Sequence, residues 1–364
     1  MPQADRAGRP ATPGFAIVAI ALAGLLFSLT PFAERLDDAL LDLEWRLLRK
    51  FAPRAAPDDI IIVGVDEASV RAVDAPPGLW HQPLGKALER IAGAAPKAIG
   101  LDIPLPERSY ESFHPGLDRP LAEGLAAART QTLLVAALGI DPRTRSARVV
   151  HAPFLAILGE GGLGIGLLGR DGDGVTRRFS LAIPTEDGGF PTLAGRLCRG
   201  LARHCSEGLI DYSLGEPFRY VPLREVLSTR DETYLSKLFR ARIVMIGDIR
   251  PADRIEVPVN VAGWEEGGGT SPAVVVHAQA LRTSLAGAPT QAARPLAVVL
   301  LTLAALVALV RDRWMAALTA LLVAAAFFSG AVFGLRAGSH VGLAGAFFTL
   351  AVAVLVRASR LARA

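Results

Sequence analysis

Acidic residues stand at the ends of short apolar stretches of this sequence. Asp66 and Glu67 follow the run IIIVGV, Asp102 and Glu107 lie within and beyond AIGLDIP, and Asp248 follows RIVMIG. Unbroken apolar, β-branched runs are typical of strands buried on both faces of a parallel sheet. Ligands of such sheets bind beyond the carboxyl ends of the strands, so we expect these carboxylates to converge on one ligand-binding cleft. The alternative is that each carboxylate caps the helix or turn that follows it.

Strands and helices must alternate to position these carboxylates. The pattern of apolar residues predicts strands at 60–65, 98–104 and 132–137, with helices at 83–92 and 117–129 between them. This alternation implies right-handed crossovers and a parallel sheet that carries helices on both faces.

The second half of the domain has a different pattern. Segments 166–170 and 177–183 flank the turn-forming DGDG at 171–174, which predicts an antiparallel hairpin. Three further elements are expected beyond it: a helix at 191–205, a buried strand at 242–247 and a helix at 274–285. The predicted domain is therefore α/β, largely a parallel sheet with an antiparallel hairpin added.

Motifs of catalysis and metal binding are incomplete in this sequence. The GxGxxG match at 164–169 is followed by a turn instead of the helix that a dinucleotide site needs. The DGDG at 171–174 lacks the later oxygen ligands of a calcium loop. The histidines show no HxH or HxxxH pairing, and no Gly-x-Ser-x-Gly sequence is present. We therefore expect no enzyme activity, no metal and no cofactor.

The chain has two cysteines, Cys198 and Cys205, within the predicted helix at 191–205. On an unbroken helix, residues seven apart are separated by about 10 Å, beyond the roughly 7 Å between Cα atoms that a disulfide spans. A bridge therefore requires the helix to end near Arg203. The sequence leaves the bridged and the free state as alternatives.

Four apolar stretches predict membrane-spanning helices, at 15–33, 292–310, 314–335 and 338–356. Each has close to the roughly 20 residues that a helix needs to cross the hydrocarbon core. The alternative for the first stretch is a cleaved signal peptide, but no convincing small-x-small cleavage site follows it. The sequence thus predicts an α-helical membrane part of four spans in contact with membrane lipid.

Basic residues near these stretches predict their orientation. They are Arg6, Arg9, Arg311, Arg313, Arg357, Arg360 and Arg363. Because arginine favours the cytoplasmic side, residues 34–291 form a periplasmic domain, while residues 1–14 and 357–364 lie in the cytoplasm. Such short cytoplasmic segments hold no folded domain, so we expect no catalytic output there. The net charge of +4 without a Lys/Arg run predicts no nucleic-acid partner.

Small residues and one amphipathic segment indicate how the helices pack. Gly330 and Gly334 are four residues apart, and Gly342 and Gly345 lie in the last span, so helix backbones can approach closely there. The contact is either among this chain's own spans or in a homodimer. Residues 34–51 predict an amphipathic helix that continues from the first span, either as a stripe on the domain core or as a dimerising seam.

Several segments together carry a resemblance to a known family. In order along the chain they are IIIVGVDEAS, GLWHQP, KAIGLDIPLPE, DGDGVTRRFSL, FRARIVMIGDIRPADRIEVPV and VVVHAQAL. With one span before them and three after, residues 36–357 resemble the CHASE domain of type 2. Bacteria place this extracytoplasmic sensory module ahead of adenylate or diguanylate cyclases, histidine kinases and serine/threonine kinases.

The resemblance implies a ligand site and a role. By resemblance, recurring polar positions of the family fall on Asp66, Asp102, Asp248, Asp253 and His277. Trp80 begins the sequence Trp-His-Gln-Pro, where the family has Trp-Pro-Trp. The implied protein is a sensor of the bacterial inner membrane. It would bind a small-molecule or protein stimulus in the periplasm and signal to a separate kinase, cyclase or regulator.

Two other roles compete with sensing. One is a structural or scaffolding membrane protein, or a relic of a larger receptor, without a ligand. The other is a periplasmic hydrolase built on the carboxylates, which the missing catalytic motifs disfavour.

Overall fold

The computed structural model describes residues 13–57, 59–106, 108–139, 150–184, 189–202 and 204–361. Glu107 and most of the two predicted cytoplasmic ends lie outside this part of the chain. The chain divides into two compact units, one formed by Arg49–Ala288 and the other by the residues up to Leu48 together with those from Pro289 onward.

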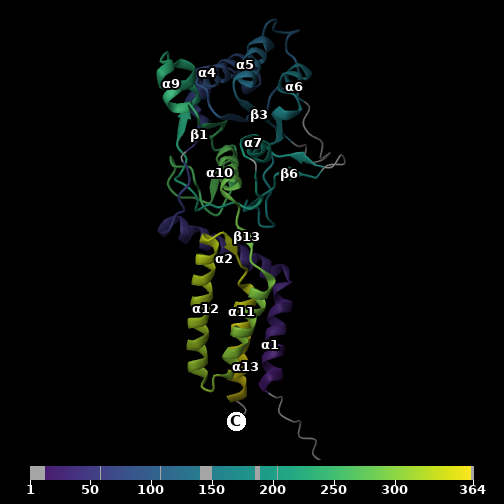
Figure 1. The fold of residues 1–364 in the computed structure, drawn as a ribbon, viewed down its shortest axis with the longest axis vertical. Coiled ribbons are helices and arrows are strands. Elements are labelled where there is room, and N and C mark those ends of the chain that lie inside the picture. The colour runs from purple at the N-terminus through teal and green to yellow at the C-terminus, as the bar shows by residue number, and fades with distance from the viewer. Residues whose placement is uncertain are drawn as a thin grey trace, which may run out of the picture. The chain divides into compact units, whose positions relative to one another are not determined.

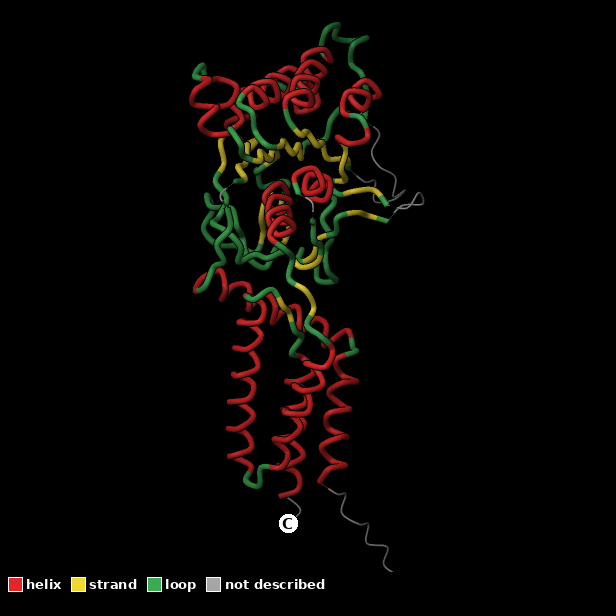
Figure 2. The backbone as a smooth tube through the Cα atoms, viewed as in Figure 1, coloured by secondary structure: helices red, strands yellow, loops and turns green. Residues whose placement is uncertain are grey.

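A six-stranded sheet forms the centre of the unit Arg49–Ala288 (Figure 2). In spatial order its strands are β4 (Leu163–Ile165), β3 (Leu133–Leu138), β2 (Ala98–Asp102), β10 (Ile243–Asp248), β1 (Ile60–Val65) and β9 (Tyr220–Pro222). All five neighbouring pairs are parallel. The prediction of a largely parallel α/β domain is therefore confirmed, and the carboxyl ends of all six strands lie at one edge.

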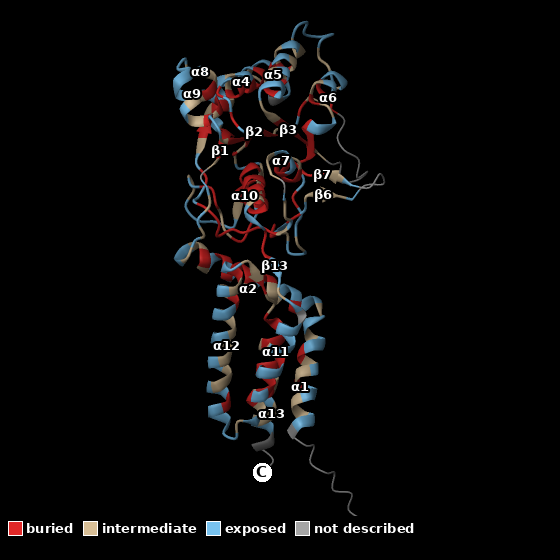
Figure 3. Cartoon of the chain, viewed as in Figure 1, coloured by how far each residue is buried: buried red, intermediate tan, exposed pale blue. Residues whose placement is uncertain are grey.

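Helices cover both faces of this sheet (Figure 1). On one face lie α4 (His81–Gly93), α5 (Asp118–Gln131), α6 (Ala152–Leu158), α8 (Leu223–Ser228) and α9 (Glu232–Phe239); on the other lie α7 (Leu193–Leu201) and α10 (Ala273–Ala286). Alternate strand residues such as Ile61, Val63 and Val65 pack with Leu88 and Ile91 of α4 in one core. The strands and α10 are almost wholly buried (Figure 3).

The predicted hairpin of 166–170 with 177–183 is wrong. Residues 163–165 instead form β4 of the parallel sheet, because Ala136, Ala137 and Leu138 of β3 pair with them. Three short antiparallel pairs are present: β5 (Arg178–Phe179) with β8 (Gly208–Leu209), β6 (Ala182–Ile183) with β7 (Phe190–Pro191), and β11 (Arg254–Glu256) with β12 (Thr270–Pro272). The DGDG segment is a turn whose carboxylates bind the buried Arg177.

Short elements complete this unit. They are α3 (Glu67–Val73) and the 3₁₀ helices η1 (Pro77–Leu79) and η2 (Glu160–Gly162).

The other unit is built from helices that are apolar, except for one amphipathic helix that begins at Pro31. They are α1 (Pro13–Ser28), the first part of α2 (Pro31–Phe51), α11 (Arg294–Leu306) with the 3₁₀ turn η3 (Val307–Leu309), α12 (Arg313–Arg336) and α13 (Ala344–Leu361). The two-residue strands β13 (Thr290–Gln291) and β14 (Ser339–His340) pair in parallel within it. Helix α1 packs against both α11 and α13.

Among the described residues, α12 is the one helix that is long and apolar enough to cross a membrane by itself. Helices α1 and α2 meet the same criterion only as a pair bent by 80°, and the apolar parts of α11 and α13 are shorter. The four-span membrane part therefore stays a prediction. The amphipathic helix expected at 34–51 is present as part of α2. It does not continue unbroken from the first span, because Pro31 begins a new helix after the break at residues 29–30.

The glycines predicted to pack helices have different surroundings. A Cβ on Gly345 of α13 would lie 3.1 Å from the carbonyl oxygen of Gly24 on α1, so these two helices approach closely there. Gly342 instead lies against the carboxylate of Asp37, which accepts hydrogen bonds from the backbone N–H groups of Leu343 and Ala344. Gly334 faces the carbonyl oxygen of Ser339, and a Cβ on Gly330 would have no neighbour within 4 Å.

Candidate functional site

A cavity of about 1080 Å³ opens at the carboxyl edge of the sheet. Val65, Asp102 and Asp248, at the ends of β1, β2 and β10, all line it. The other polar lining groups are Asp253, Arg250, Arg108 and Tyr110; the apolar wall includes Trp80, Leu84, Leu105, Leu121 and Leu138. This size is at the upper end of the roughly 300–1000 Å³ typical of small-molecule sites.

Asp102 is the most deeply placed carboxylate of the cavity. Its side chain is 12% exposed, and its buried Oδ2 has no hydrogen-bond partner. Burial raises the pKa of the Asp102 carboxyl to about 7, because the charged form loses its hydration. Asp102 is thus a buried acceptor whose partner is missing.

His277 of α10 lies beside Asp102, with 3.8 Å between Nε2 and Oδ1. The ring is buried, and Nδ1 has no hydrogen-bond partner. Burial lowers the pKa of the imidazole to about 4, against the opposing charge of Asp253. At neutral pH His277 is therefore neutral and does not form an ion pair with Asp102.

The remaining acidic groups of the cavity differ in their partners. Asp248 forms a bidentate ion pair with Arg250, in which Nη2 lies 2.6 Å from Oδ2. Asp253 is half-buried, and burial, with the nearby charges of Asp102 and Asp248, raises the pKa of its carboxyl. The cavity thus combines one neutralised carboxylate with two that lack a basic partner among the described residues.

The other residues predicted for the site are arranged differently. Asp66 is the N-cap of α3, where it accepts a hydrogen bond from the backbone N–H of Ser69, and it does not line the cavity. Exposed Glu67 begins α3, and its charge helps Asp248 to raise the pKa of the Arg250 guanidinium. Trp80 does line the cavity, with its indole N–H bonded to the carbonyl of Ala75.

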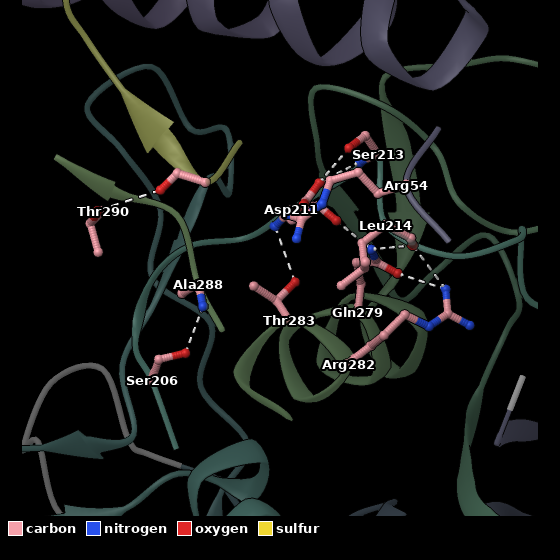
Figure 4. A network of polar contacts seen from close by, with 11 residues as sticks. Arg54, Ser206, Asp211, Ser213, Leu214, Gln279, Arg282, Thr283, Ala288 and Thr290 are labelled. Atoms are coloured by element: carbon pink, nitrogen blue, oxygen red, sulfur yellow. Dashed lines mark hydrogen bonds and ion pairs between the residues drawn. The ribbon is translucent and has the colours of Figure 1, made fainter. Parts of the chain in front are cut away.

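A second polar cluster, which we call the junction network, surrounds α10 away from the cavity (Figure 4). Its members are Arg54, Asp211, Ser213, Gln279, Arg282 and Thr283. The fully buried carboxylate of Asp211 accepts hydrogen bonds from Arg54 Nη1 at 2.6 Å and from the hydroxyl of Ser213 at 2.7 Å. The backbone N–H of Asp211 donates to Thr283 Oγ1.

Two α10 side chains bind the backbone of the loop that follows Asp211. Gln279 Nε2 donates to the carbonyl oxygen of Leu214 at 3.0 Å. Arg282 Nη1 donates to the carbonyl oxygens of Leu214 and Glu216, and its guanidinium stacks on the ring of Phe218 at 3.8 Å. The side chain of Arg49, near the end of α2, bonds the next carbonyl of this loop, at Gly215. The loop is thus held from α10 and from α2.

Sequence reasoning missed this network and Arg250. A signal exists for both, because Gln279 and Arg282 are polar residues three apart in the largely apolar helix VVVHAQALRTSL. Arg250 stands two residues after Asp248, a spacing at which the carboxylate also binds the backbone N–H of Arg250. The loop around Asp211 carries no comparable signal, since its partners are distant in the sequence.

The structure joins Cys198 and Cys205 in a disulfide with 6.0 Å between the Cα atoms. The predicted helix at 191–205 is too long: α7 ends at Leu201, and Ala202 is extended. This end removes the separation that an unbroken helix would impose. The hydroxyl of Ser284 on α10 lies 3.3 Å from Cys198 Sγ, and Ser206 Oγ accepts a hydrogen bond from the backbone N–H of Ala288.

No group of three or more histidine, cysteine or acidic side chains within the described ranges is placed to hold a metal ion. The arrangement is that of an α/β domain with a cavity at the carboxyl edge of its parallel sheet. The family model of the CHASE2 domain matches residues 16–321, most of the chain, so the chain belongs to the CHASE2 domain family. CHASE2 domains are extracellular sensory modules. No curated protein and no solved structure is significantly similar to this chain.

Proposed function

We propose that this chain is a sensory protein of the bacterial inner membrane, which binds a stimulus in the cavity and signals through its apolar helices to a separate effector. The observation that carries the proposal is the position of α10. This one buried helix contributes Ala273 to the cavity and Gln279 and Arg282 to the junction network. The proposed role is binding and transmission, not catalysis.

Helix α10 is suited to transmit a displacement. Its 14 residues span about 21 Å at 1.5 Å per residue. It packs closely on β10, since a Cβ on Gly247 would lie 2.5 Å from Cβ of Val274. A ligand that displaces the start of α10 therefore acts on a rigid element whose other end binds the junction network. A shift between two such states needs only a few kcal/mol of differential binding.

The chain connects the unit Arg49–Ala288 to the other unit at two places, and side chains of the junction network lie near both. One is the end of α2, where Arg49 and Arg54 bind the loop at 211–216. The other is the end of α10, which leads to Pro289. Within the unit of apolar helices, Asp37 of α2 in turn binds the start of α13. We propose that the stimulus changes these two connections together.

The proposal includes four spans, at 15–33, 292–310, 314–335 and 338–356, with residues 34–291 in the periplasm. The apolar helix α12 and the extracellular character of the family support it. Because CHASE2 domains usually relay signals to cytoplasmic effectors, a kinase, cyclase or regulator is the proposed partner. Alkaline phosphatase fused at residue 150 should be active and fused at residue 312 inactive; the reverse pattern would contradict this orientation.

The decisive experiment fills the cavity from α10. Ala273→Phe places a ring in the cavity, whereas Ala126→Phe on the exposed face of α5 is the matched control. The full chain is captured from native membranes by crosslinking, and the activity of the co-purified signalling protein is measured. We expect Ala273→Phe, but not the control, to change that activity several-fold. If no effector is recovered, and deletion of residues 49–288 changes no regulated output, the scaffold role replaces the sensory role.

A further inference from the structure

We propose that the cavity binds a small organic cation, an ammonium group on an apolar body, with Asp102 and Asp253 as its counter-ions. The inference deepens the proposed function, on which it rests, by naming the chemical class of the stimulus.

The charges of the cavity favour a cation. Arg250 is already engaged in a bidentate ion pair with Asp248. Arg108 lines the cavity but is exposed and lies over the ring of Tyr110, 5.7 Å from its centroid. Within the described part of the chain, no lysine or arginine forms an ion pair with Asp102 or Asp253. The two carboxylates that remain therefore attract positive charge.

The hydrogen bonds of the cavity favour a donor. Asp102 Oδ2 is buried without a partner, a state that costs free energy until a donor reaches it. An ammonium group carries three hydrogen-bond donors and no acceptor, so it can donate to the carboxylates of Asp102 and Asp253 together. A carboxylate or phosphate ligand would instead place negative charge beside these two carboxylates, which disfavours its binding.

The apolar wall of the cavity favours a ligand whose remaining part is apolar. Trp80, Leu84, Leu105, Leu121 and Leu138 line the remainder of the cavity. Burial of a hydrocarbon or aromatic body against them is favourable by the hydrophobic effect. The volume of about 1080 Å³ suits a small molecule.

A cation at this site also changes protonation. Burial raises the pKa of Asp102 to about 7, and the titratable and charged groups near it are Asp253, Asp248, Arg250 and His277. An ammonium group favours the ionised carboxylate, so binding at pH 6.5 releases a proton from Asp102. A neutral ligand has no such effect.

The test compares three probes of similar shape, 2-phenylethylamine, 2-phenylethanol and phenylacetate. Each is titrated calorimetrically into the full chain in lipid nanodiscs. We expect the amine to bind at least tenfold more tightly than the alcohol, and phenylacetate to bind most weakly. At pH 6.5 the heat of amine binding should vary with the ionisation enthalpy of the buffer, which reports the released proton.

Two variants sharpen the test. Asp102→Asn should weaken amine binding at least tenfold and leave alcohol binding unchanged; Glu123→Gln, on the exposed face of α5, should change neither. Three outcomes would overturn the cation assignment: equal binding of amine and alcohol, tighter binding of phenylacetate than of the amine, or no amine binding at millimolar concentration. The sensory role is tested separately, by Ala273→Phe. Amine binding without any effect of Ala273→Phe on the effector would instead overturn the sensory role and leave the cation site standing.

Discussion

The cavity and the junction network are two polar clusters of one domain, and both are reached by α10. In the network the Asp211 carboxylate has partners for both oxygens, and the carbonyl of Leu214 accepts from two side chains. In the cavity Asp102 Oδ2 has none, and neither has Nδ1 of His277, which lies beside Asp102 but does not line the cavity. A buried polar group with its partners is compatible with a stable fold, whereas one without them costs free energy that a ligand can recover. The network is therefore suited to hold two chain connections together, whereas the proposed ligand would supply the partner that the cavity lacks.

This contrast predicts opposite effects of removing a carboxylate, and the largest effect is in the network. Asp211→Ala leaves Arg54 and Ser213 without their partner in a buried position. We expect a loss of about 3–5 kcal/mol in the free energy of unfolding. Urea unfolding of the full chain in nanodiscs, followed by near-ultraviolet circular dichroism, measures it. A loss below about 1 kcal/mol would contradict the role assigned to the network.

In the cavity the same kind of change should stabilise the protein. The pKa of Asp102 is about 7 in the folded state and 3.8 without burial, so ionised Asp102 lowers stability increasingly as the pH rises from about 4 to about 7. Asp102→Asn should therefore raise the free energy of unfolding by roughly 2–4 kcal/mol at pH 8 and leave it unchanged at pH 4. Destabilisation at pH 8 would show that Asp102 has a partner after all.

The same variant exposes the opposite pH dependence of His277. Burial lowers the pKa of His277 from 6.5 to about 4, so this residue reduces stability as the pH falls through that range. In the wild type the two groups oppose each other between pH 4 and 6.5. Between pH 4 and 6.5 the stability of Asp102→Asn should rise with pH by about 1 kcal/mol per unit more than that of Asp102→Asn combined with His277→Gln. The difference between the two variants isolates His277 from other titrating groups such as Asp253.

The smallest expected effect concerns the disulfide near the end of α10. Replacing Cys198 and Cys205 by alanine opens a short loop, for which chain entropy predicts a loss of about 2 kcal/mol in the free energy of unfolding. The two bridged residues lie against Ser284 and Ser206, away from the cavity lining. Binding of 2-phenylethylamine, measured by calorimetry, should therefore be unchanged in the double variant. A change in the affinity for 2-phenylethylamine would mean that the disulfide affects ligand binding in the cavity.

The sequence by itself determined the four central strands β1, β2, β3 and β10, the helices α4, α5 and α10, and the edge at which the carboxylates gather. The runs IIIVGV and RIVMIG are apolar because both faces of their strands are covered, and a parallel sheet brings their carboxyl ends to one edge. Asp102 and Asp248 line the cavity for this reason. The periodicity of local segments is enough for such inferences, because it reflects burial residue by residue.

Only the tertiary structure decided which residues meet. The insertion of β10 between β1 and β2 and the pairing of β4 with β3 in place of a hairpin both depend on partners distant in the sequence. The same holds for Asp211, whose partners Arg54 and Thr283 are 157 and 72 residues away. A local pattern carries no information on such contacts, because long-range packing selects among conformations that the segment alone allows equally.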